Sequence, residues 1–300
     1  YPRFQYELLV KLDEKHPGPP EMNAKLFFQA REYEDDKTIE KTFDKLNRLG
    51  DSLSLGSPLH NIHFIRANYY SYKDNIQQMH EALINMVENN PTHWITYIYC
   101  LDFARNETCI KKILNICKKH VGPDQEYIYE VLSAFANSLL NNYTSSVNML
   151  NHRIDKLNQM ISNQHDEIRT EVFPLIYSYA HLTRAMGLLQ TNRYSDALKD
   201  LEVYEESSSA KIKVFSTRLK AIIYFAQSNI DELTKFLHLE KHFKKYEEPM
   251  LHLLSMVFVE KDYQKAYDFL KAMQPSNPSF FGPHLKLLEG IVNHEVGEIE

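Results

Sequence analysis

The chain has 300 residues, of which 43% are hydrophobic and 25% are charged, and these shares exclude a mainly disordered protein. Its net charge of −6 provides no strong positive field, which argues against nucleic-acid or anionic-membrane binding through overall charge. Only 8 glycines occur, which favours long helices over a glycine-rich β fold.

The sequence contains none of the segments that direct a chain into or across a membrane. The start, Tyr1-Pro2-Arg3-Phe4, lacks the basic and apolar regions of a signal peptide, and no apolar run reaches 18 residues. The three cysteines, Cys100, Cys109 and Cys117, have no paired spacing, which favours buried thiols in a reducing compartment. We therefore expect a cytoplasmic or nuclear protein.

In chain order, a short first helix is followed by a break at Pro17-Gly18-Pro19-Pro20, which cannot continue a helix. From Glu21 onward, amphipathic helical patterns alternate with short turns that contain Pro, Gly, Asn or Asp, and no strand-length segment alternates with period two. We predict two parts. Residues 1–57 form an N-terminal helical cap or degenerate repeats, and residues 58–300 form a helical repeat array.

The array shows a repeat of helix pairs. Ala197, Leu233 and Ala266 occupy equivalent positions in the second helix of successive pairs and lie 36 and 33 residues apart. Segment 192–201, NRYSDALKDL, resembles the turn and second helix of a tetratricopeptide repeat (TPR), whose period is 34 residues. The resemblance implies an all-α, right-handed superhelical solenoid of antiparallel helix pairs.

Some segments fit this pattern less well. Segment 89–103, NNPTHWITYIYCLDF, resembles half-a-TPR (HAT) repeats or auxiliary subunits of N-terminal acetyltransferases at least as closely. The helix pair at 94–121 is short, and an extended helix is expected near 144–172. The last predicted helix, 283–296, has no expected partner in the chain, so we expect that it either caps the array or pairs with a helix of a longer native protein.

The search for catalytic and metal-binding patterns favours a protein that is not an enzyme and needs no cofactor or metal. The sequence has no phosphate-binding glycine loop, no nucleophile elbow and no HExxH or CxxC pair. His238 and His242 are four residues apart on a predicted helix, but no third ligand is evident nearby, so two exposed histidines are the better interpretation. His60 and His63 are interpreted in the same way.

One basic cluster offers a possible site for an acidic partner or for RNA. It consists of Lys111, Lys112, Lys118 and Lys119 on one predicted helix. The alternative is a solvated helix face whose last lysines suit the helix dipole, and the negative net charge further weakens the case for RNA.

The TPR resemblance implies that the first helix of each pair lines a concave groove. The expected groove residues are Phe64, Tyr72, Trp94, Ile98, Val131, Phe135, Tyr179, Leu182, Met186, Phe215, Arg218, Phe225 and Phe258. Only Asn68 and Arg218 resemble the clamp that grips acidic chaperone tails, which disfavours that function. Either a helix or extended segment of a partner fills the apolar groove, or tight winding buries these residues within the array itself.

These expectations together predict a non-catalytic scaffold or adaptor subunit of a multiprotein complex. Two alternatives stay open: a receptor for a peptide or small ligand, and an RNA-processing scaffold of the HAT type.

Overall fold

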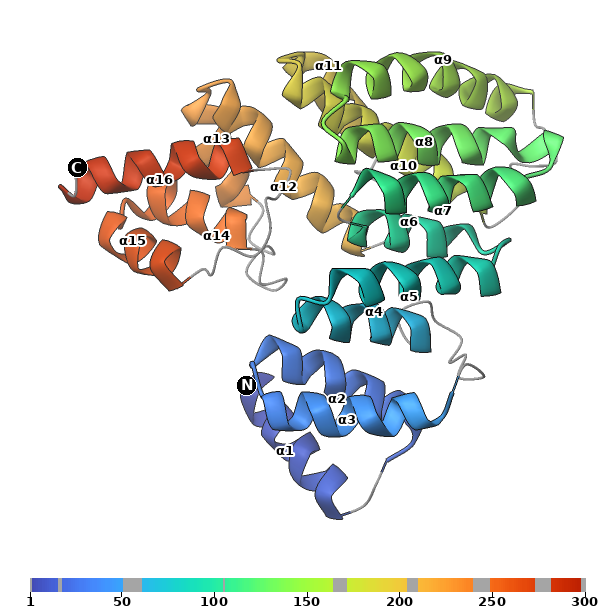
Figure 1. Cartoon of the computed structure of the whole chain (residues 1–300). Coiled ribbons are helices and arrows are strands. Elements are labelled where there is room, and N and C mark those ends of the chain that lie inside the picture. The colour runs from blue at the N-terminus through green and yellow to red at the C-terminus, as the bar shows by residue number, and fades with distance from the viewer. Residues whose placement is uncertain are drawn as a thin grey trace. The chain divides into compact units, whose positions relative to one another are not determined.

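The computed structural model describes most of the chain. The described residues are 2–15, 18–50, 61–104, 106–163, 172–203, 210–239, 249–272 and 282–297. Throughout these ranges the regular elements are helical, so the predicted all-α class is confirmed (Figure 1). By its internal packing the chain divides into two compact units, Tyr1–Leu132 and Ser133–Glu300. The division expected at 57/58 falls outside the described residues and stays a prediction. Each compact unit is described separately below.

The first unit is a series of packed helices. It contains α1 (Pro2–Lys15), α2 (Pro20–Glu32), α3 (Asp36–Arg48), α4 (Ile62–Tyr72), α5 (Ile76–Asn89), α6 (Trp94–Phe103), α7 (Glu107–His120), a short 3₁₀ turn at Pro123–Gln125, and the first part of α8 (Glu126–Leu139). Helix α1 packs on α2, α3 packs on both α2 and α4, and α5 packs on α4, α6 and α7. Fully buried side chains such as Phe27, Leu46 and Ile65 form the core beneath α1–α4.

The second unit begins within α8. It continues with α9 (Tyr143–Ser162), α10 (Val172–Gln190), α11 (Tyr194–Glu202), α12 (Ala210–Ala226), α13 (Ile230–Leu239), α14 (Pro249–Ser255), a π-helical turn at Met256–Glu260, α15 (Tyr263–Ala272) and α16 (Gly282–Val296). One apolar core, with Leu201, Ile223 and Leu253 among its fully buried members, extends from α9 to α16. Helix α16, the last predicted helix, packs against α15, as a helix that caps the array would.

The same helical turn recurs along both units. A non-glycine residue with positive φ ends the first helix of a pair at Glu34, Asp74, Asn141, Asn192, Ser228 and Lys261. At the first five of these positions, the residue with positive φ donates its N–H to the carbonyl three residues earlier, and the next residue donates to the carbonyl five residues before itself. These paired bonds are the Schellman motif, which satisfies the last carbonyls of a helix.

The residue after each positive-φ position also starts the following helix. The side chains of Asp35, Asn75, Asn229 and Asp262 accept a hydrogen bond from the backbone N–H three residues later. An Asp or Asn at this position satisfies one of the unpaired donors of the new helix. A single residue thus closes one helix and opens the next, and this local chemistry folds the chain into repeated helical hairpins.

Small residues let the helices of a pair approach each other. Ala67, Ala134, Ala185 and Ala221, each seven residues before a positive-φ position, are fully buried. At Gly187 in α10 the approach is closest, because an added Cβ would lie 2.6 Å from Cγ2 of Val147 in α9. The predicted equivalence of Ala197, Leu233 and Ala266 is also confirmed, since each lies five residues after a positive-φ position and is fully buried.

The extended helix expected near 144–172 is shorter in the structure. Helix α9 ends at Ser162, where the backbone N–H of Asn163 bonds to the carbonyls of Gln159 and Ile161. Residues 164–171 lie outside the described part of the chain, and α10 begins at Val172. Even so, α9 has 20 residues, which is more than α11 or α13, the second helices of the two hairpins that follow.

Candidate functional site

Aromatic rings from three consecutive first helices meet in the first unit. Phe64 of α4 lies 6.3 Å from Phe28 of α2, and 5.9 Å and 5.7 Å from Tyr99 and Phe103 of α6, measured between ring centroids. We call these four residues the aromatic ladder. Phe64 is buried at its centre, whereas the other three rings are half-buried and keep part of their surface in water. The ladder therefore connects α2, α4 and α6 in one layer of aromatic rings, and the rings of α2 and α6 are partly exposed to water.

A polar network borders the ladder. Arg31 of α2 donates hydrogen bonds from Nη1 to the backbone carbonyl and the side-chain oxygen of Asn68 in α4, at 3.0 Å and 2.9 Å. Its guanidinium carbon lies 5.7 Å from the centre of the Tyr72 ring, within the range of a cation–π contact. The predicted groove residues Phe64 and Tyr72 thus lie on the same layer as Arg31 and Phe28, which the sequence analysis did not single out.

Two further ring pairs involve predicted groove residues of the second unit. Phe135 of α8 contacts Tyr179 of α10 edge-to-face, with 6.3 Å between centroids. Phe225 of α12 and Phe258 of the π-helical turn lie 5.6 Å apart. In both pairs the sequence had assigned the two residues to successive first helices, and the structure brings them into contact.

Most of the predicted groove residues are nevertheless covered by the chain itself. The buried ones are Phe64, Trp94, Ile98, Val131, Phe135, Leu182, Met186 and Phe225. Tyr72, Tyr179, Arg218 and Phe258 are half-buried, and the side chain of Phe215 lies outside the described part. Burial of this kind is what the self-burial alternative expects, so the accessible surface is limited to the half-buried rings.

On α6, the predicted groove residues lie on a different face from the residues that contact Phe64. Trp94 and Ile98 keep only 4% of their surface exposed, and Trp94 packs on Tyr97 inside the unit. Tyr99 and Phe103 are the residues that reach Phe64. The segment WITYIYCLDF is apolar on every side, so its helical period does not show which face meets the preceding pair.

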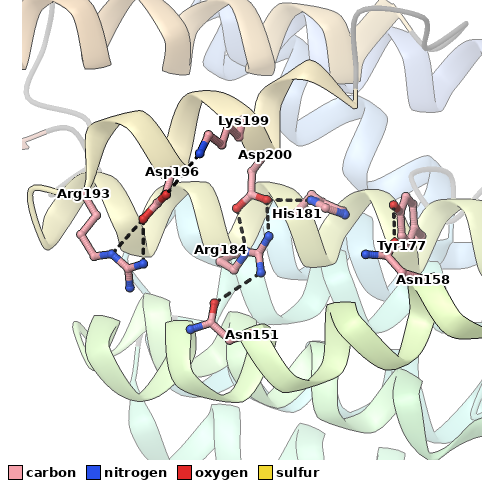
Figure 2. Close-up of polar contacts among 9 residues, drawn as sticks. All are labelled: Asn151, Asn158, Tyr177, His181, Arg184, Arg193, Asp196, Lys199 and Asp200. Atoms are coloured by element: carbon pink, nitrogen blue, oxygen red, sulfur yellow. Dashed lines mark hydrogen bonds and ion pairs between the residues drawn. The ribbon is translucent and has the colours of Figure 1, made fainter.

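A second cluster, which the sequence analysis missed, is polar and buried (Figure 2). Asp200 of α11 accepts two hydrogen bonds from Arg184 of α10, from Nε at 2.8 Å and from Nη2 at 2.6 Å. Nδ1 of His181 lies 2.8 Å from the same carboxylate, and Arg184 reaches Asn151 of α9 at 3.3 Å. The side chain of Asp200 is only 2% exposed. The network around this buried carboxylate joins α9, α10 and α11.

The electrostatics of this cluster keep Asp200 ionised. Burial alone would raise the pKa of this carboxyl group, but the hydrogen bonds from Arg184 and His181 outweigh burial and hold the pKa below its usual value. Nε2 of His181 is buried and has no hydrogen-bond partner, and the ring of Tyr177 packs edge-on against the imidazole at 4.7 Å. Because both carboxylate oxygens are occupied and the imidazole is covered, the cluster suits the joining of helices better than acid–base chemistry.

The lysines of the predicted basic cluster have the surroundings of a solvated helix face. Lys111, Lys112, Lys118 and Lys119 are exposed on α7; Lys111 pairs with Glu107, and Nζ of Lys118 lies 5.7 Å from the Tyr129 ring. Their predicted binding of RNA or an acidic partner stays a prediction.

Among the described residues, the histidines and cysteines belong to no group of three or more His, Cys, Asp or Glu side chains that could hold a metal ion. His63 is buried beside Asn89, so the interpretation of His63 as an exposed histidine is wrong. His238 is exposed as expected, while His60 and His242 lie outside the described part. Burial raises the pKa of Cys109 to about 11 and that of Cys117 to about 12, so both thiols stay protonated and unreactive.

Two general findings complete this description. None of the helices in the described ranges combines the length and the apolar character needed to cross a membrane. Comparison with family models, with curated proteins and with solved structures gave no match. The class of protein is therefore defined by the fold alone, as an all-helical chain in which one type of helix-to-helix turn recurs.

Proposed function

We propose that this protein is a TPR-like scaffold or adaptor that binds a segment of another protein and catalyses no reaction. The observation that carries this proposal is the aromatic ladder, in which rings from three consecutive first helices form one layer and those of α2 and α6 are half-buried. The recurring hairpin turn supports the repeat character, because stacked units of one kind create an extended binding surface.

The chemistry of the ladder favours an apolar partner segment. Aromatic side chains are enriched where proteins bind one another, and they offer a large contact area at a small cost in conformational entropy. Arg31 borders the rings, and its Nη1 donates hydrogen bonds to Asn68 within the same unit. A helix or extended strand with apolar anchors fits this surface better than an acidic chain terminus, which needs several converging cations.

The experiment that tests the proposal compares three forms of the chain, none of them truncated. These are the wild type, Tyr99→Glu in the ladder, and Ile76→Glu on α5 as the control. Ile76 is also apolar and is 48% exposed, but it begins the second helix of its pair. Each protein is tagged and used to capture interacting proteins, which are quantified by mass spectrometry, and circular dichroism checks that each is folded.

We expect the wild type and Ile76→Glu to retain a stoichiometric protein partner and Tyr99→Glu to lose it by at least about tenfold, as for a central interface residue. A milder variant, Tyr99→Ser, separates binding from folding if the charged variant unfolds. Equal recovery from all three folded proteins would contradict the ladder as the binding surface. Recovery of a short peptide or small ligand in place of a protein subunit would favour the receptor alternative.

A further inference from the structure

The outer face of α1 carries an apolar stripe with no cover in the described structure. Phe4, Leu8 and Leu12 are 67%, 48% and 44% exposed. They follow one another at intervals of four residues, so they lie on one face of the helix. The other exposed large apolar residues of the described chain occur singly: Ile76, Ile95, Ile161 and Leu287 on separate helices, and Leu49 and Val203 directly after a helix end.

The opposite face of α1 fixes the direction in which this stripe points. Tyr6 is buried in the core and donates its hydroxyl hydrogen bond to Asp35 at 2.5 Å. Asp13 is 1% exposed and forms ion pairs with Lys41 and Lys45 of α3, at 3.1 Å and 2.7 Å. Because α1 is held by both the apolar and the charged contacts, the stripe faces away from its own unit and cannot turn inward without breaking them.

The charges beside the stripe indicate what covers it. Glu7 and Lys11 lie along one edge of the stripe, four residues apart and opposite in sign. Consider a second α1 that runs antiparallel, with Leu8 opposite its own copy and Phe4 opposite Leu12. The helical positions then bring Glu7 near Lys11 of the second chain, and Lys11 near Glu7. In a parallel two-fold pair, this edge of the second helix would instead lie on the opposite side of the interface, so Glu7 and Lys11 of the two chains would not meet.

We propose that the Phe4–Leu8–Leu12 stripe is a self-association site, on which α1 of a second copy of this chain packs antiparallel. The arrangement is isologous, so one patch serves as both halves of a two-fold interface. Three side chains bury less than the roughly 800 Å² per partner of a standard stable interface. The pair is therefore weak and forms in a concentration-dependent way.

Sedimentation equilibrium of the full chain tests this proposal, over concentrations from roughly 10 µM to roughly 1 mM, where such weak pairs become populated. We expect a monomer–dimer equilibrium that Leu8→Glu weakens at least about tenfold, because it places a charge on the two-fold axis. Leu287→Glu, at a residue 56% exposed on α16, is the matched control and leaves the equilibrium unchanged. Circular dichroism confirms that both variants are folded.

A charge exchange tests the orientation. Glu7→Lys alone should weaken the dimer by placing two cations together, and the double variant Glu7→Lys, Lys11→Glu should restore it. A chain that stays monomeric at every concentration overturns the proposal and leaves the stripe to a helix of another protein. A dimer that tolerates Leu8→Glu, or a double variant as weak as the single one, also overturns it.

Discussion

Asp200 is the residue at which the stability contributed by a buried ion pair can be compared with that of an exposed one. Its carboxylate is 2% exposed and holds Arg184, whose own side chain is 19% exposed. At the equivalent place in the second helices of the other hairpins the chain has Thr42, Ala82, Met149, Phe236 and Phe269. Charge at this position is therefore particular to one hairpin, and it fixes how α9, α10 and α11 meet.

Replacing Asp200 with Asn should lower the free energy of unfolding by about 3 kcal/mol, because it leaves the Arg184 cation without its buried partner. Asp196→Asn is the control, since the Arg193–Asp196 pair is about half exposed on both sides. That change should cost less than about 1 kcal/mol. Urea unfolding followed by circular dichroism measures both, and equal losses would contradict the structural importance of the buried pair.

The pKa of Asp200 predicts how stability depends on pH. Its folded-state pKa lies below the unfolded value of about 3.9. The carboxylate therefore contributes stability that is complete above that value and is lost as the pH falls through the folded pKa. The stability difference between wild type and Asp200→Asn should shrink below about pH 4. Urea unfolding at pH 7 and at lower pH tests this, and a constant difference would show that the carboxylate does not titrate as described.

At the scale of the element, the packing of α9 on α10 depends on the missing side chain of Gly187. Gly187→Ala should lower the free energy of unfolding by about 1–3 kcal/mol, because the new methyl group would overlap Val147. Gly290→Ala in α16 is the matched control, since its added Cβ would meet no atom within 4 Å. That substitution should instead raise stability by up to about 1 kcal/mol, through the higher helix propensity of alanine.

Thermal unfolding of the two alanine variants measures these opposite effects. If both variants gained stability, the close approach of α9 and α10 at Gly187 would not exist in solution. If both lost stability, the helical character of α16 around Gly290 would be in doubt.

For the whole molecule, the division into two units predicts where the effect of a local change stops. Each helix packs mainly on its neighbours in sequence within its own unit. Gly187→Ala should therefore speed hydrogen exchange in α9, α10 and α11 and leave α2–α5 unchanged. Hydrogen exchange read by mass spectrometry tests this, and faster exchange in α2–α5 as well would show that the chain opens as one cooperative block.

The sequence by itself determined the helical class, the break after the first helix and the equivalent positions of successive hairpins. These features depend on local chemistry. Proline ends a helix, Asp or Asn starts one, and apolar residues at helical spacing mark a buried stripe. Even the turns at Asn192 and Asp74 use residues that tolerate positive φ, although Glu34 and Lys261 show that other residues adopt it when the motif requires it.

Only the tertiary structure decided which residues meet. It assigned Tyr99 and Phe103, rather than Trp94 and Ile98, to the aromatic ladder. It also buried Asp200 and left Leu8 exposed. Such outcomes depend on neighbours contributed by other helices, and a helix that is apolar on several sides does not indicate in its own sequence which side they will cover. A buried carboxylate is stable only because Arg184 and His181 arrive from another helix, and that meeting is a property of the fold.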